Sequence, residues 1–244
     1  MSNWNDPRPT GSPFGNGPVL NGEALGAVTM DQGLRRYMLS IYNYMASGVL
    51  LSGIVALMFA NSGMAAQIYG GPLWFVIALA PLAFIFFFSP NRSTSTLQTM
   101  FWSFCVVMGL SLSVVFLRYT NASIATTFFA TAGAFAGLSL YGYTTKRNLS
   151  AMGSFMTMGL IGIIIAMLLN MWLQSSGLSL AISVLGVIIF AGLTAWDTQR
   201  LRDTYYHVAG TDMMGKVIIL GALTLYLDFI NMFQFLLSFL GSRD

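Results

Sequence analysis

The chain has 244 residues, of which 56% are hydrophobic and only 8% are charged, and its mean hydropathy is +0.71. Because soluble globular domains carry about 25% charged residues, this composition excludes a soluble protein and predicts a polytopic membrane protein. The length accommodates about six to eight membrane spans with short loops and leaves no room for a separate soluble domain.

Residues 1–33 differ from the rest of the chain, since they are rich in Gly, Pro and Asn and contain no apolar run of signal-peptide length. This composition predicts a disordered tail. We therefore divide the chain into a disordered cytoplasmic N-terminal tail, 1–33, and a membrane domain, 34–244. Without a cleavable signal, the first span is expected to act as the targeting anchor.

Seven apolar runs follow in chain order, and each is a predicted membrane span. They cover residues 37–60, 73–88, 97–117, 124–143, 152–173, 178–196 and about 213–240. The second run is short and contains Pro81, which is tolerated in a span where neighbouring helices satisfy the freed carbonyl. The predicted fold is all-α, a seven-transmembrane helix bundle. Gly133 and Gly137, in a small-xxx-small pattern, predict a close helix contact in the fourth span.

The basic residues predict the orientation of these spans. With the N-terminus inside and the C-terminus outside, only Arg118 and Arg243 of the membrane domain fall outside. The cytoplasmic side then receives the other basic residues, as the positive-inside rule requires: Arg35, Arg36, Arg92, Lys146, Arg147, Arg200, Arg202 and Lys216. The pI of about 9.1 thus reports topology and contact with anionic lipids of the bilayer, and gives no reason to expect a nucleic-acid partner.

Two acidic residues, Asp197 and Asp228, lie within apolar spans, the sixth and the seventh. A carboxylate at membrane depth is costly unless it faces a cavity or a partner, so both are candidate functional residues. If the chain reverses near Gly210, their depths differ by about 7 Å at 1.5 Å per residue, which helix tilt or an uneven turn can absorb. We therefore expect the two side chains to meet.

Two carboxyl groups that meet inside a bundle cannot both ionise at low cost, so the pair would titrate as a coupled unit and act as a proton sensor. The same oxygens suit a hard cation such as calcium. Asn231, one helical turn after Asp228, can add an amide oxygen. The alternative is structural, with Asp197 capping the interfacial end of its helix and Asp228 hydrogen-bonding a neighbour.

The segments around these aspartates resemble a known family. Residues 195–201, AWDTQRL, resemble the sixth-span signature of the transmembrane Bax inhibitor motif family, and residues 225–237, LYLDFINMFQFLL, resemble its last-span signature. The resemblance implies a bundle with a central last helix and a pH-sensitive calcium leak through the bacterial inner membrane. It assigns the gate and cation site to Asp197 and Asp228. It also implies an arginine latch, for which Arg92 is the nearest residue, although an ordinary positive-inside charge explains Arg92 as well.

Two other classes of function stay open at this stage. One is a regulator of membrane-protein quality control or stress response, which would bind membrane partners such as a protease. The other is a proton-coupled transporter, although the sequence has no convincing inverted repeat. Enzyme chemistry is not expected, because the single histidine, His207, is interfacial and an intramembrane serine protease needs a deep one. No cofactor is expected beyond a permeant or bound calcium ion.

Overall fold

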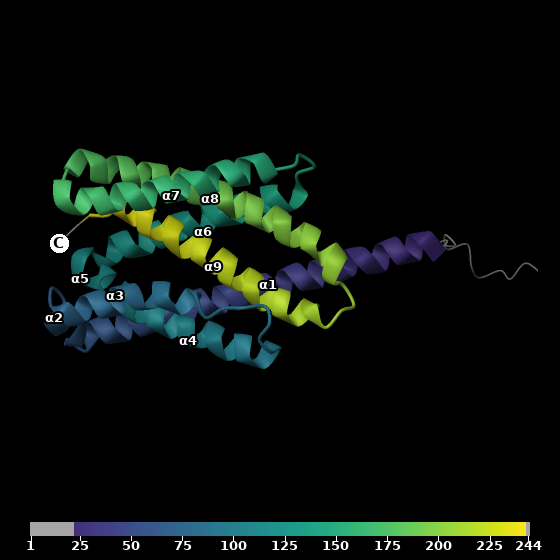
Figure 1. Cartoon of the computed structure of the whole chain (residues 1–244), viewed down its shortest axis with the longest axis horizontal. Helices are drawn as coiled ribbons and strands as arrows, with labels where there is room; N and C mark the ends of the chain where they lie inside the picture. The colour runs from purple at the N-terminus through teal and green to yellow at the C-terminus, as the bar shows by residue number, and fades with distance from the viewer. Residues whose placement is uncertain (1–21, 243–244) are drawn as a thin grey trace, which may run out of the picture.

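Each predicted apolar run forms a helix in the computed structural model, which describes residues 22–242 (Figure 1). Two short helices were not predicted as separate elements: α2 (Met64–Ile68) lies in the connection between α1 and α3, and α5 (Val115–Arg118) lies at the end of the third predicted run. The remaining helices are α1 (Gly22–Asn61), α3 (Pro72–Ile85), α4 (Thr94–Leu112), α6 (Asn121–Thr144), α7 (Ser150–Leu173), α8 (Ser176–Val208) and α9 (Met213–Leu240).

Six of these helices, rather than the predicted seven, are long and apolar enough to cross a membrane. The exception is α3, which has 14 residues and is therefore about 21 Å long, short of a hydrocarbon core of about 30 Å. Pro81 does not end α3, since it lies buried inside the helix. The helix ends at Ile85, and the chain continues through tight turns in which Phe87 and Phe88 donate to the carbonyls of Phe84 and Ile85. The protein is an all-α polytopic membrane protein with six long apolar helices and one shorter one.

Helix α1 begins earlier than the predicted membrane domain. Residues 22–33 were assigned to the disordered tail, but they form the first turns of α1. The Gly- and Pro-rich composition ends near Asn21, and the following residues include the good helix formers Glu23, Ala24 and Leu25. The rest of the predicted tail, residues 1–21, lies outside the described residues.

Helix α9 packs against four other helices, α1, α4, α6 and α8. In Figure 1 it runs between the group formed by α6, α7 and α8 and the group formed by α1, α3 and α4. Half of the most apolar 18-residue stretch of α9 is buried, which is the largest share among the six long helices. The connections α3–α4, α6–α7 and α8–α9 all lie at one end of the bundle, which we call the basic end because it carries Arg92, Lys146, Arg147 and Lys216. There Lys216 Nζ approaches the carbonyl of Pro90 at 3.3 Å.

A buried hydroxyl pair ties α9 to α1 and α4. The Ser52 hydroxyl lies 2.7 Å from the carbonyl oxygen of Cys105 and 2.6 Å from the Tyr226 hydroxyl, and neither Ser52 nor Tyr226 has exposed surface. Because Ser52 has one proton and the carbonyl can only accept, Tyr226 donates to Ser52 when Ser52 donates to Cys105. The rings of Phe101 and Phe104 meet the Tyr226 ring edge-on. This cluster fixes α9 against the α1–α4 group.

The substitution Ser52→Ala is expected to lower the free energy of unfolding by about 1–3 kcal/mol, because it leaves the buried Tyr226 hydroxyl without a partner. Tyr226→Phe should cost less, about 1 kcal/mol, since the Ser52 hydroxyl can still donate to the carbonyls of Cys105 and Gly48. Unfolding in detergent, followed by thiol modification of the buried Cys105, measures both. Equal costs in the two variants would contradict this arrangement.

The close helix contact of α6 is not where the glycine pattern predicted it. No atom lies within 4 Å of a Cβ added at Gly133 or Gly137, so neither glycine packs against another helix. The contact is made by Gly142, where an added Cβ would overlap the backbone carbonyl of Ala195 in α8. The pattern was misleading because spacing alone identifies small residues that share a face, but not whether that face meets a neighbour.

Candidate functional site

Asp197 of α8 and Asp228 of α9 are brought together between the two helices. Each residue is 4% exposed, and their carboxyl groups lie within hydrogen-bonding reach of each other. The depth difference expected from the sequence is absorbed in the packing of α8 against α9, which are joined by the short turn at residues 209–212. The predicted meeting of the two side chains is therefore present in the structure.

The contact between the two carboxyl groups has a direct chemical consequence. Two carboxylate anions can only accept hydrogen bonds, so a hydrogen bond between these groups needs a proton on one of them. Oδ1 of Asp197 and Oδ2 of Asp228 accept no well-directed hydrogen bond from the described residues. Buried carboxyl oxygens of this kind are costly unless a proton, a cation or water satisfies them. The pair can therefore accept a proton or a cation.

Arg200 supplies a cation to one side of the pair. Its Nη2 lies 2.8 Å from Oδ1 of Asp197, three residues earlier on the same helix. The contact is an ion pair without a well-directed hydrogen bond, as the unsatisfied Oδ1 shows. The Arg200 side chain is 49% exposed, and its guanidinium lies 4.8 Å from the centre of the Trp196 ring. A half-exposed cation compensates Asp197 only in part, and Asp228 has no comparable partner in the described chain.

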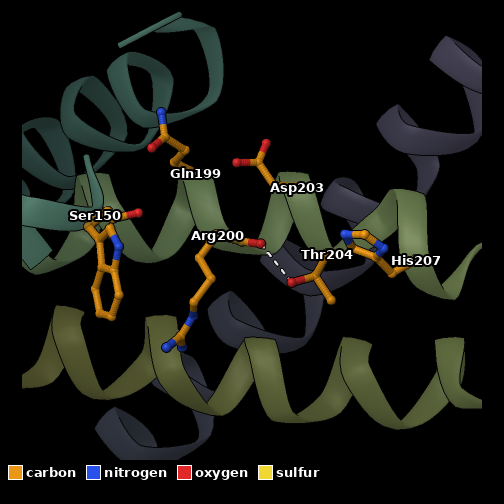
Figure 2. A pocket seen from close by; sticks show the side chains of 7 residues that line it. Ser150, Gln199, Arg200, Asp203, Thr204 and His207 are labelled. Carbon is orange, nitrogen blue, oxygen red and sulfur yellow. Dashed lines mark hydrogen bonds between the residues drawn. The ribbon is translucent and has the colours of Figure 1, made fainter. Parts of the chain in front are cut away.

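A cavity of about 230 Å³ lies on the outer surface of α8 beside Arg200 (Figure 2). It is lined by residues from the start of α7 and the basic end of α8: Ser150, Trp196, Gln199, Arg200, Asp203, Thr204 and His207. Figure 2 shows the Arg200 side chain pointing toward α9, away from Asp203 and Gln199. The cation that faces Asp197 is therefore at the boundary between the bundle interior and an open, polar surface.

The neighbours of Asp197 on α8 hold the helix in place. Gln199 accepts from the amide of Leu149 and donates to the carbonyl of Arg147, both at 2.8 Å. Arg202 donates to the carbonyl oxygens of Tyr143 at 2.7 Å and Thr145 at 3.1 Å, at the end of α6. These bonds satisfy loop and helix-end groups that otherwise lack partners. They fix the rotation of α8, and with it the direction of Asp197.

Asn231 and Arg92 occupy different positions from the pair. Asn231 lies one turn after Asp228 and is half-buried, and its amide nitrogen donates to the carbonyl of Leu227 at 2.8 Å. Arg92 is exposed in the connection between α3 and α4, where its backbone amide closes a turn onto Ser89. The charged side chain that pairs with Asp197 is Arg200, so the structure does not place Arg92 in that role.

The pair does not form a complete calcium shell in the described part of the chain. No group of three or more His, Cys, Asp or Glu side chains gathers there. Calcium takes about six to eight oxygen ligands, and two carboxyl groups supply at most four oxygens. The pair alone therefore cannot complete the coordination of a bound calcium ion.

Sequence reasoning missed three contributors to this site: Arg200, Gln199 and Arg202. Arg200 was interpreted only as one of the cytoplasmic basic residues, although its position three residues after Asp197 places both on one helix face. That spacing was a usable signal. The carbonyl partners of Gln199 and Arg202 come from the connection between α6 and α7, and no sequence pattern indicates them.

Comparison with known proteins identifies the family of this chain. The Bax1-I family, inhibitor of apoptosis-promoting Bax1, matches residues 34–244, a range that contains both aspartates. The chain belongs to this family.

Similar proteins cover nearly the same length. An uncharacterised protein of Rickettsia prowazekii is 47% identical over 220 residues, covering 88% of this chain and 93% of that protein. An uncharacterised protein of Caulobacter vibrioides is 46% identical over 232 residues, covering 88% and 92%. The inner membrane protein YbhL of Escherichia coli K12 is 44% identical over 218 residues, covering 86% and 93%.

Proposed function

We propose that this protein is a pH-sensitive cation leak channel for calcium, gated by Asp197 and Asp228 between α8 and α9. The observation that supports the proposal is the buried contact between the two carboxyl groups, each of which keeps an oxygen that accepts no well-directed hydrogen bond. Buried ionisable side chains inside a membrane bundle mark ion pathways and proton relays. Carboxylate oxygens are also the ligands that a hard cation prefers.

The gate works through the charge of the pair. With a proton between them, the carboxyl groups can hydrogen-bond and hold α8 against α9. Without it, two anions in a medium of low dielectric repel each other and attract a cation. The charged groups that act on the pair within the described chain are the two carboxyl groups and Arg200. The helices α1 and α6, which pack against α8, contribute the neutral polar groups Tyr42 and Ser139 next to Thr198.

The proposal includes a location and an orientation. Because the relative YbhL is described as an inner membrane protein, we assign this chain to the bacterial inner membrane. The basic end of the bundle then faces the cytoplasm, in agreement with the positive-inside rule, and the C-terminus faces outside. In this orientation α3, with the turns that follow it, completes a seventh span, and α9 is the central helix. Asp228 lies near the middle of α9, and Asp197 lies in the half of α8 nearer the basic end.

Purified protein in liposomes with an internal calcium indicator tests the proposal. Calcium flux should change through one titration step as the pH is varied, and empty liposomes should show no such step. Protein-dependent flux that stays constant over the whole pH range would contradict a gate made of this pair. So would the absence of any flux above that of empty liposomes.

Arg200→Gln is expected to move the midpoint of the flux profile to higher pH by about half a unit. The guanidinium favours the charged form of Asp197, so without it deprotonation needs a higher pH. A half-exposed ion pair contributes up to about 1 kcal/mol, and a shift of one pH unit corresponds to about 1.36 kcal/mol, so the expected shift is below one unit. Arg200→Lys keeps the charge and serves as the matched control. A midpoint that stays in place or moves to lower pH in Arg200→Gln would exclude this role of Arg200.

A second function remains a proposal, that of a regulator that binds membrane partners such as a protease in a stress response. The feature that favours it is the N-terminal part of α1, which projects from the basic end beyond the other helices in Figure 1. A helix end outside the bundle offers surface to a partner without disturbing the packed helices.

A further inference from the structure

The buried face of α6 is unusually polar for a helix inside a membrane bundle. Its buried residues are Thr127, Thr131, Phe135, Ser139 and Gly142, so three of the five carry hydroxyl groups. The first four recur every four residues and therefore follow one side of the helix toward α8 and α9. Thr131 has no exposed surface, and its hydroxyl donates to the carbonyl of Thr127 in its own helix at 2.8 Å.

At the end remote from the basic end, this face opens into a cavity of about 310 Å³ between the start of α6 and the end of α9. Five hydroxyl-bearing residues line it, Thr120, Ser123, Thr126, Thr127 and Ser242. We call the row of buried hydroxyl groups at Thr127, Thr131 and Ser139 the hydroxyl stripe. Thr127 also lines the cavity, so the cavity reaches the first hydroxyl of the stripe. Hydroxyl groups can hydrogen-bond water and offer oxygens to a cation.

At the other end, the stripe reaches α8 at Thr198. The Thr198 hydroxyl donates to the Ser139 hydroxyl at 3.3 Å, and the Tyr42 hydroxyl lies within reach of both side chains. Thr198 directly follows Asp197 on α8. The three polar side chains come from α1, α6 and α8, so the stripe ends in a polar cluster one residue along α8 from Asp197.

One aromatic contact interrupts the stripe between Thr131 and Ser139. The rings of Phe135 and Phe229 lie 5.6 Å apart at 73°, and Phe128 packs on Phe229 at the same distance. Phe135 is 5% exposed and Phe229 is 3% exposed, and Phe229 directly follows Asp228. An apolar constriction of this kind excludes water and ions until its rings move apart.

We propose that ions and water reach the aspartate pair from the outer side along the hydroxyl stripe of α6, and that the Phe135–Phe229 contact is the apolar barrier on this route. The stripe takes small hydrated cations. This inference rests on the proposed cation leak for its physiological meaning. The route itself can be tested without any flux.

Single cysteine variants test the route through their reaction with a small, charged, water-soluble thiol reagent added to the outside of oriented liposomes. Thr131→Cys, on the outer side of the barrier, should react, whereas Ser139→Cys, on its inner side, should not. Ser139→Cys combined with Phe135→Ala should react. Two positions give the background reactivity. Phe129, which is 73% exposed on the other face of α6, represents a lipid-facing position when replaced by Cys, and the natural Cys105 represents a packed one.

Flux gives the second measurement. Phe135→Ala should raise calcium flux about tenfold or more, because it removes one ring of the barrier. Phe129→Ala, the same change on the exposed face of α6, should leave flux unchanged. Continued protection of Cys105 in Phe135→Ala shows that the variant is folded.

The two measurements separate the inference from the proposed function. The labelling pattern without any calcium flux supports the route and overturns the leak. A pH-sensitive flux with Thr131→Cys no more reactive than Phe129→Cys supports the leak and overturns the route. Reaction of Ser139→Cys with Phe135 intact would overturn the barrier.

Discussion

Replacing Asp228 with Asn should abolish the pH dependence of calcium flux, so that the ratio of the fluxes in acidic and alkaline buffer is about one. Asn has nearly the same shape as Asp and still bonds to Asp197, but it cannot lose or share the proton. The remaining carboxyl then has no anionic partner, and its ionisation no longer drives α8 and α9 apart. Calcium flux from liposomes over the full pH range measures the change.

Asp212→Asn is the matched control, because it removes a carboxylate from the exposed turn before α9 without touching the pair. Its profile should be that of the unmodified protein. If Asp228→Asn kept the normal titration step, the pair would not be the sensor, and both aspartates would return to a structural role.

The largest effect on stability is expected for Gly142→Leu. The added Cβ would overlap the carbonyl of Ala195, which is backbone and cannot rotate away, so α6 would have to separate from α8. Overpacking of this kind costs about 3 kcal/mol or more, far above the gain in helix propensity. Because Ser139 lies one turn away, the bond between Ser139 and Thr198 should also break. Thermal unfolding in detergent, reported by modification of Cys105, measures the loss.

Gly137→Leu provides a strict comparison on the same helix, since nothing lies within 4 Å of its added Cβ. It should be neutral or slightly stabilising, because leucine has the higher helix propensity by about 0.8 kcal/mol. Similar destabilisation by both substitutions would mean that α6 does not meet α8 at Gly142.

The sequence predicted the helices well because membrane spans leave a strong signal in hydropathy. The last run was predicted at about 213–240 and α9 covers Met213–Leu240. Prediction was weaker where ends depend on local turns: α3 stops at Ile85 rather than at 88, and the third run is divided into α4 and α5 near Ser113. Helix α1 begins before the predicted domain because its first residues favour a helix in spite of the Gly- and Pro-rich segment before them.

The central pair of the candidate site could also be predicted, since two acidic residues in apolar spans must find partners. The surroundings could not. Arg200 rather than Arg92 meets Asp197 because α8 continues as a helix past the pair toward the basic end, which places a cation one turn away. The contact between Phe135 and Phe229 depends on the rotation of two helices, which sequence spacing does not determine.

The central claim is that Asp197 and Asp228 share a proton whose loss operates the gate. Infrared spectroscopy of the protein in liposomes tests it most directly, through the carbonyl stretch of a protonated carboxylic acid. The unmodified protein should show such a band, and Asp228→Asn should lack it. In the unmodified protein the band should disappear over the same pH interval in which calcium flux changes. A band that titrates outside that interval, or one that Asp228→Asn retains unchanged, would contradict the claim.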